Sequence, residues 1–436
     1  MEASLQDILN ARENRVNRQK QLLQQYEKTL VCFTMNIAGP VKYTPLIAEG
    51  FRMGCEALAA QLGNAILFSE KLPRHTGCEA FFVVAMEAQQ VKAITTAIEE
   101  ATPLGRLFDM DVLTPDGRKL DRGTERRCLL CEQSARVCGR SRAHTVEQLQ
   151  QKTNAILRAT VAEQRSHHLA AMAVKALLYE VCCTPKPGLV DRENSGRHRD
   201  MDIFTFMGSA AVLQPYFAAC AKAGMDGEGF ERIRFLGKEA EQTMLRETGG
   251  VNTHKGAIFT MGLLCAAAGG EESADPDAIL SRVKELCRGL THRDFAGINM
   301  ENAKPAGERL YAEYGITGVR GQAEAGYPAV LHTGLPVLEE GVENGLSLER
   351  AGCAALLAML TATADTNMIA RSDRQTAGRI SREVALLLAR DRYPDAEKLR
   401  ALDALFTEND LSPGGTADLL AAVFFLYFLK KKDRSC

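Results

Sequence analysis

The sequence predicts a two-domain protein, with an α+β domain over residues 1–150 and an all-α domain over residues 165–436. The chain has 436 residues, more than one growing hydrophobic core usually accommodates, so more than one domain is expected. Before residue 150, short β-branched and aromatic runs lie between helical stretches, which is typical of an α+β sheet domain. After about residue 160, long stretches rich in alanine and leucine replace these runs and favour helices.

The first domain is expected to begin with an amphipathic helix from Leu5 to Tyr26. Four strand-like runs follow it: LVCFTMNI, GNAILFSEKL, AFFVVAM and LFDMDVL. The basic segment CLLCEQSARVCGRSRAH, which comes next, has no clear period. The polar run QLQQKTNAILRATVAEQ predicts a helical connector and places the domain boundary between residues 145 and 165.

The second domain is expected to consist of helices such as HLAAMAVKALLYEVC and AALLAMLTATADTNMIA, joined by loops dense in Gly, Pro, Asn and Asp. Irregular polar loops on a rigid frame are common places for binding groups. Near the end, the apolar run from Leu419 to Leu429 is shorter than the roughly 18 to 20 residues that span a bilayer. It predicts a buried helix followed by lysines.

Charge and cysteine content exclude several classes of protein. The net charge of -2 provides no global field for nucleic acid or an anionic membrane, so neither is expected as a partner. The N-terminal residues have no secretory pattern, which predicts a cytoplasmic protein. In that reducing compartment, the 13 cysteines are expected to be free thiols or metal ligands.

Two aspartates in the last predicted strand of the first domain form a candidate catalytic metal site. Asp109 and Asp111 are two residues apart, so on a strand they point to the same face and can hold Mg²⁺ against a polyphosphate. Upstream, Gly39 allows close backbone approach and Lys42 supplies phosphate charge, as in nucleotidyltransferase-like sites. Alternatively, the aspartates flank a solvent-facing edge strand.

Cys128, Cys131, Cys138 and His144 are soft ligands whose spacing is similar to that of a zinc knuckle, so one Zn²⁺ is a candidate cofactor here. The alternatives are partly buried thiols, or phosphate binding by the arginines of the same segment, which are Arg127, Arg136, Arg140 and Arg142.

The runs NIAGPVKYTPLI, PLGRLFDMDVL and RRCLLCEQSARVCGRSRAH resemble the citrate lyase holo-acyl-carrier-protein synthase family over nearly all of residues 1–150. The resemblance implies transfer of a phosphoribosyl-dephospho-CoA unit to a serine of the apo citrate lyase acyl carrier (gamma) subunit, with release of diphosphate. On this basis Asp109 and Asp111 would bind metal and diphosphate, and Lys42 with Arg140 or Arg142 would contact anions.

Five further motifs resemble the triphosphoribosyl-dephospho-CoA synthase family over residues 165–430. They are EVCCTPKPGLVDRENSGRHRDMD, TGGVNTHKGAIF, YGITGVRGQAEAGYP, ADTNMIAR and NDLSPGGTADLLA. The resemblance implies that the 2′-hydroxyl of 3′-dephospho-CoA displaces adenine from ATP, and the presence of both domains resembles fused forms. Malonate decarboxylase uses a similar synthase, and a nucleoside glycosidase would need the same loops and acids, so both remain alternatives.

Several residues of these motifs are candidates for the site. Asp191, Asp200 and Asp202 are candidate Mg²⁺ ligands, with helix capping as the alternative for an aspartate. At a predicted helix start, Asn252, His254 and Lys255 are expected to contact phosphate, and His254 either protonates the departing adenine or caps the helix. The remaining basic candidates for substrate binding are Lys186 and Arg320.

Asp365 is predicted to lie inside an otherwise apolar helix, which makes it a catalytic candidate because a buried carboxylate is costly unless paired or metal-bound. Asn367 and Arg371 accompany it, with a structural Asp–Arg pair as the alternative. In the last motif, Ser412 is a possible cap, Pro413 a possible first helical residue, and Gly414 and Gly415 leave room for a ligand. Gln322 stands where the family is expected to have a glutamate, and Glu324 is the nearest acid.

Overall fold

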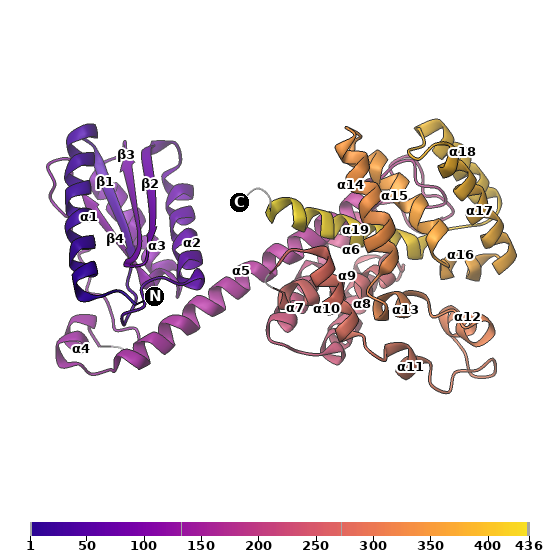
Figure 1. Cartoon of the computed structure of the whole chain (residues 1–436), viewed down its shortest axis with the longest axis horizontal. Coiled ribbons are helices and arrows are strands. Elements are labelled where there is room, and N and C mark those ends of the chain that lie inside the picture. Colours follow the sequence, from indigo (N-terminus) through magenta and orange to yellow (C-terminus); the bar gives the residue numbers. More distant parts are fainter. Residues whose placement is uncertain (1, 132, 272, 434–436) are drawn as a thin grey trace. The chain divides into compact units, whose positions relative to one another are not determined.

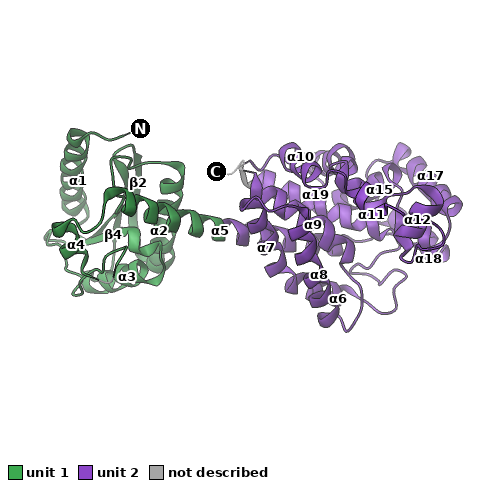
Figure 2. Cartoon of the chain, turned by 90° about the horizontal axis from the view of Figure 1, so that it is seen from below, with its two compact units in different colours: residues 1–164 green, residues 165–436 purple. Residues whose placement is uncertain are grey.

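The structure is a computed structural model that describes residues 2–131, 133–271 and 273–433. The chain divides into two compact units, Met1–Gln164 and Arg165–Cys436 (Figure 2). The first unit contains a sheet with helices and the second is helical, so the predicted α+β and all-α classes are confirmed.

A four-stranded antiparallel sheet forms the centre of the first unit, in the order β2-β3-β1-β4. Its strands are β1 (Thr29–Met35), β2 (Ile66–Arg74), β3 (Gly77–Val84) and β4 (Phe108–Leu113). Each coincides with one of the four predicted runs to within a few residues. In the central strand β1, Cys32 lies opposite Phe81 of β3 on one side and Asp111 of β4 on the other.

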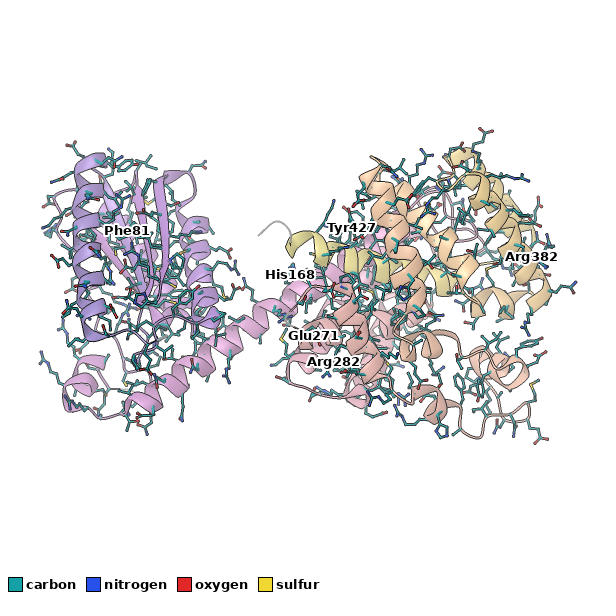
Figure 3. All side chains as sticks on the ribbon, in the orientation of Figure 1. Phe81, His168, Glu271, Arg282, Arg382 and Tyr427 are labelled. Carbon is teal, nitrogen blue, oxygen red and sulfur yellow. The ribbon has the colours of Figure 1, made fainter. Side chains whose placement is uncertain are left out.

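Helices cover both faces of this sheet (Figure 1). Helix α1 (Leu5–Tyr26) has the predicted bounds and starts with a capping box between Ser4 and Asp7. It packs Leu22 against Cys32 and Phe81 on one face, where Phe81 is fully buried (Figure 3). Helices α2 (Pro45–Leu62) and α3 (Ala88–Ala101) cover the other face, and two short 3₁₀ turns, Gly63–Ala65 and Gly105–Leu107, precede strands β2 and β4.

The predicted connector is helical, but it is part of one long helix. After β4 comes the short helix α4 (Ala135–Ser141), and then α5 (Val146–Cys182) runs through the boundary between the units. Leu157 of α5 belongs to the core of the first unit, and Leu169 and Leu177 to the core of the second.

The second unit is built from the end of α5 and fourteen further helices in its described residues (Figure 1). They are α6 (Ile203–Val212), α7 (Gln214–Met225), α8 (Phe230–Glu247), α9 (Lys255–Gly270), α10 (Pro276–Leu286), α11 (Leu290–Phe295), α12 (Ala306–Tyr314), α13 (Gly318–Glu324), α14 (Leu335–Glu343), α15 (Leu348–Ala362), α16 (Thr366–Arg371), α17 (Arg374–Arg390), α18 (Ala396–Glu408) and α19 (Gly414–Asp433). One turn of π-helix, Val330–Gly334, precedes α14.

Helices α9 and α19 form the apolar centre of this unit. Nearly every residue of α9 is buried, and a side chain at Gly224 of α7 would collide with the carbonyl of Ala266, so these two helices pack backbone to backbone. In α19 the run from Leu419 to Leu429 is buried, as predicted, and includes Tyr427 (Figure 3). Lys430 follows it and pairs with Glu339 at 2.7 Å.

No single helix in the described residues combines the length and apolar character needed to cross a bilayer. The consecutive helices α6 and α7, bent by 42°, meet that test only as a pair.

The prediction that Asp365 lies inside an apolar helix is wrong. Helix α15 ends at Ala362, and α16 begins at Thr366, so Asp365 lies between two helices. Its side chain accepts hydrogen bonds from the backbone N–H groups of Asn367 and Met368, so it starts a new helix instead of continuing the old one.

Candidate active sites

A cavity of about 290 Å³ opens in the second unit, and all five motifs contribute residues to its lining. It is lined by nine of the residues that the sequence singled out: Lys186, Asn252, His254, Lys255, Asn367, Arg371, Ser412, Gly414 and Gly415. Segments separated by more than 200 residues therefore form one site.

Close packing between two loops shapes the cavity. Gly188, in the loop after α5, has a φ of +70°, and a Cβ there would lie 2.4 Å from the carbonyl oxygen of Leu411. Asp403 of α18 accepts a 2.8 Å hydrogen bond from the N–H of Gly188 and another from the side chain of Asn194. A side chain at position 188 would separate the loops, so glycine is required.

Two long helices begin at the cavity and bring positive charge to it. The first residues of α9 and α19, Lys255 and Gly414, both line it, and helix N-termini carry partial positive charge with unpaired N–H groups. Arg371 also lines the cavity with an exposed side chain, and partial desolvation together with the nearby Arg197 lowers its pKa. Lys255 is exposed and pairs with Glu241 at 2.9 Å. The cavity is thus suited to an anionic ligand such as a polyphosphate.

Three ionisable groups form a buried wall of the cavity, close to the start of α9. Lys186 forms an ion pair with Glu180 of α5, and both side chains are buried. Asp418 of α19 lies beside them; burial, and then the charge of Glu180, raise its pKa well above the ordinary value. A Cβ on Gly256 would collide with the Asp418 carboxylate, so the glycine at this position allows the carboxylate to lie against the start of α9. The sequence analysis did not single out Glu180 or Asp418, although both are acids in apolar runs.

His254 is buried at the N-terminus of α9 and lines the cavity. Burial, and secondarily Lys186, lower its pKa to about 3, so the ring is neutral at physiological pH. Thr253 donates to the Ser209 hydroxyl at 2.8 Å, and Ser209 Oγ lies 2.7 Å from His254 Nδ1. We assign the ring proton to Nε2, which is buried and has no partner among the described residues. The alternative prediction, that the His254 side chain caps helix α9, is not confirmed, because this side chain makes no capping hydrogen bond.

Asp365 is buried behind the cavity, where it joins two helix starts. One oxygen accepts from the backbone N–H groups of Asn367 and Met368, and the other from the N–H and hydroxyl of Thr416, both at 2.7 Å. The spaces beside Gly414 and Gly415 are occupied by Asn367 and Asp365, so these glycines accommodate protein side chains where room for a ligand was expected.

The three candidate Mg²⁺ ligands of the second unit do not converge. Asp191 is buried and accepts from the backbone N–H groups of Lys186, Glu193 and Asn194. Asp202 caps α6 through Thr205, which agrees with the alternative prediction that one of these aspartates caps a helix. Asp200 is exposed. Because two of these carboxylates are engaged in local structure, the three do not fit a shared metal site.

Other predicted residues lie outside the cavity lining. Arg320 pairs with Asp294 at 2.7 Å and stacks over Phe295. Gln322 is partly buried in α13, and Glu324 accepts a hydrogen bond from the N–H of Thr291.

The last motif contributes Ser412, which lines the cavity. Its hydroxyl lies 3.3 Å from His198 Nε2, and Pro413 immediately precedes the first residue of α19.

In the first unit, Asp109 and Asp111 point to the same face of β4, as predicted. Their side chains are 42% and 28% exposed, so carboxylate oxygens remain open to solvent. Asp111 pairs with Lys119 at 2.6 Å, and Asp109 lies 3.9 Å from Arg126. Two neighbouring, accessible carboxylates fit the oxygen ligands that Mg²⁺ prefers. Lys119 and Arg126 were not singled out by the sequence.

The remaining candidates of the first unit lie in different settings. Lys42 is half-buried; burial and the nearby Arg12 lower its pKa. Gly39 has a φ of +80°, and a Cβ there would collide with Gln150 of α5. The group that approaches the Gly39 backbone closely is therefore this protein side chain. Arg140 and Arg142 are exposed at the end of α4.

Comparison with known proteins gives two family matches. Residues 3–160 match the family described as apo-citrate lyase phosphoribosyl-dephospho-CoA transferase (CitX), and residues 166–436 match ATP:dephospho-CoA triphosphoribosyl transferase (CitG). The chain is 35% identical to protein CitXG of Haemophilus influenzae, over 98% of this chain and 96% of that protein. It is 31% identical to protein CitXG of Leuconostoc mesenteroides, over 97% and 96%. A probable 2-(5′′-triphosphoribosyl)-3′-dephosphocoenzyme-A synthase of Lactiplantibacillus plantarum is 42% identical over 58% of this chain and 94% of that protein.

Proposed function

The chain belongs to the CitXG family of transferases that act in biosynthesis of the citrate lyase prosthetic group, and we propose that it carries out two consecutive reactions. The second unit makes 2′-(5′′-triphosphoribosyl)-3′-dephospho-CoA and adenine from ATP and 3′-dephospho-CoA. The first unit then transfers the phosphoribosyl-dephospho-CoA part to a serine of the apo citrate lyase acyl carrier (gamma) subunit and releases diphosphate.

The cavity of the second unit supports the first reaction because it combines a cationic side with a buried acidic wall. The starts of α9 and α19, with Lys255 and Arg371, bind the triphosphate of ATP. The 2′-hydroxyl oxygen of dephospho-CoA forms a bond to C1′ of the ATP ribose while the bond from C1′ to adenine N9 breaks. Negative charge close to the ribose stabilises the partial positive charge that develops at C1′.

One proton must leave the attacking hydroxyl, and one must reach the departing adenine. We assign this proton movement to Asp418, whose raised pKa brings proton exchange closer to neutral pH. The low pKa of His254 keeps its ring neutral at physiological pH, so it has no imidazolium proton to give to adenine, and its Nε2–H donates a hydrogen bond to an acceptor on the base or phosphate. Lys186 and Glu180 hold the buried wall in place.

In the first unit, the serine hydroxyl of the acyl carrier attacks the phosphorus nearest the ribose, and diphosphate leaves, as in a nucleotidyltransferase-like reaction. Asp109 and Asp111 would hold Mg²⁺, which neutralises charge on the triphosphate when bound. We propose that Arg126, which lies 3.9 Å from Asp109, and Lys42 contact the diphosphate.

Two substitutions separate the reactions. The full chain is incubated with ATP, Mg²⁺ and 3′-dephospho-CoA; adenine is measured by chromatography, and labelling of added apo acyl carrier by mass spectrometry. Asp418→Asn is expected to stop adenine release, but to allow labelling when purified triphosphate precursor is supplied. Asp109→Ala should do the reverse. The exposed residues Asp277 and Asp116 provide matched controls, Asp277→Asn and Asp116→Ala, that keep both activities.

The same assay decides between alternatives. Release of adenine from ATP without dephospho-CoA would indicate a nucleoside glycosidase. Labelling of the malonate decarboxylase carrier in preference to the citrate lyase carrier would assign the chain to that pathway. Absence of both adenine and labelled carrier under every condition would refute the proposal.

A further inference from the structure

The cysteine and histidine side chains that follow β4 come together at one point in the first unit. One ligand atom from each of Cys128, Cys131, Cys138 and His144 lies within 4.8 Å of all the others. The sulfurs of Cys131 and Cys138 are 3.4 Å apart, and His144 Nε2 is 3.3 Å from the sulfur of Cys131. No other group of three or more His, Cys, Asp and Glu in the described residues is arranged in this way.

These separations match the size of a tetrahedral zinc site. Zinc–sulfur bonds of about 2.3 Å and zinc–nitrogen bonds of about 2.0 Å place ligand atoms roughly 3.5–3.8 Å from one another. The observed spread, from 3.3 Å to at most 4.8 Å, brackets that range. A disulfide needs sulfurs about 2.05 Å apart, so Cys131 and Cys138 at 3.4 Å are not bonded to each other.

Backbone structure holds the ligands in this arrangement. Residues Arg127 and Ser134 form an antiparallel bridge, which closes a turn that carries the first two cysteines. The N–H of Leu130 points to the sulfur of Cys128 at 3.4 Å, a contact that favours a thiolate. Helix α4 presents Cys138, and Arg142, with a left-handed φ of 49°, turns the chain so that His144 returns to the cluster.

The segment around the cluster has little other apolar support. Between residues 121 and 145, the buried hydrophobic side chains among those described are Cys128 and Cys138 themselves. A short loop-rich segment without its own core commonly depends on a metal for its fold.

We propose that Cys128, Cys131, Cys138 and His144 bind one structural Zn²⁺ that anchors this segment to the sheet. All four positions are filled by protein, so the site is closed, as structural zinc sites are. Arg106 donates to the carbonyl oxygens of Arg127 and Cys128, both at 3.0 Å, and Arg126 donates to that of Phe108 at 2.8 Å. Arg126 pairs with the buried Glu99 at 2.6 Å and lies 3.9 Å from Asp109, so the segment that the metal anchors begins beside the two carboxylates of β4.

Metal content of the full chain tests the proposal. Protein purified in reducing buffer without chelators is expected to contain about one zinc per chain by elemental mass spectrometry. His144→Ala and Cys131→Ser should reduce this to less than about one fifth, whereas His144→Cys should retain zinc because four cysteines also form a tetrahedral site. Cys182→Ser, at a half-buried cysteine of the second unit, is the matched control and should keep the wild-type zinc content.

A second measurement does not depend on how the variants fold. Metal-free wild-type chain titrated with Co²⁺ should develop the visible absorption of tetrahedral, thiolate-bound cobalt, saturate at about one equivalent, and lose it when Zn²⁺ is added. The proposal is overturned by wild-type protein without zinc, by zinc content that His144→Ala and Cys131→Ser leave unchanged, or by a six-coordinate cobalt spectrum. A Cys131–Cys138 disulfide in protein prepared under reducing conditions would overturn it in favour of a redox pair.

Discussion

Buried His254 is expected to make the second unit less stable in mild acid. Burial holds the pKa of His254 at about 3 in the folded chain, against 6.5 for an exposed histidine. The unfolded chain therefore binds this proton first, and stability is lost as pH falls from 6.5 to about 3 and then stays constant. At about pH 5 the loss is roughly 1.36 kcal/mol for each of about 1.5 pH units, or about 2 kcal/mol. Because pH 5 lies well above the folded pKa, this figure hardly depends on the exact folded value.

His254→Asn removes the titration and keeps an acceptor for the Ser209 hydroxyl. The free energy of unfolding is measured by urea denaturation, followed by far-UV circular dichroism, at about pH 7.5 and pH 5. Between these conditions, wild type should lose about 2 kcal/mol more than the variant. Asp365, Glu180 and Asp418, whose pKa values are raised by burial, are present in both proteins, so their titration largely cancels in the comparison.

The exposed His167 provides the matched control, because His167→Asn should leave the wild-type pH dependence unchanged. Parallel stability curves for wild type and His254→Asn would show that His254 is protonated in the folded chain, or that it is accessible to water. Either outcome would refute the assignment of a neutral ring that donates from Nε2.

Three further experiments test the buried groups of the same unit. Asp365→Ala removes the acceptor of four hydrogen bonds, and should lower the free energy of unfolding by about 2–5 kcal/mol in urea denaturation. Lys186→Met leaves the buried Glu180 without its ion-pair partner and should lower the free energy of unfolding by about 3–5 kcal/mol. Adding Glu180→Gln should recover part of this loss. A double variant no more stable than Lys186→Met would contradict the ion pair. Gly256→Ala places a Cβ against Asp418 and should reduce adenine release at least tenfold, about 1.4 kcal/mol in the barrier, while circular dichroism stays helical. Unchanged turnover in Gly256→Ala would exclude Asp418 from the reaction.

Local patterns in the sequence were sufficient for much of the fold. The capping box at Ser4 and the amphipathic period that follows define α1, and alternating or apolar runs mark the four strands. The same-face placement of Asp109 and Asp111 follows from the two-residue period of a strand. The break before Asp365 was missed, because an apolar period of 3.6 residues continues across a short interruption. The cap bonds from Asn367 and Met368 are local, but the two bonds from Thr416, 51 residues away, could not be read from the sequence.

The sequence by itself determined the family, the two kinds of domain and the motif segments that form most of the cavity lining, because each motif is a short, continuous run of residues. Only the tertiary structure decided what each charged group does. Arg320 lies in a motif, but it pairs with Asp294 outside the cavity, whereas Glu180 and Asp418, from helices more than 200 residues apart, share its buried wall. The physical reason is that burial and neighbouring charge set the pKa and the partners of a side chain, and both depend on where distant helices converge.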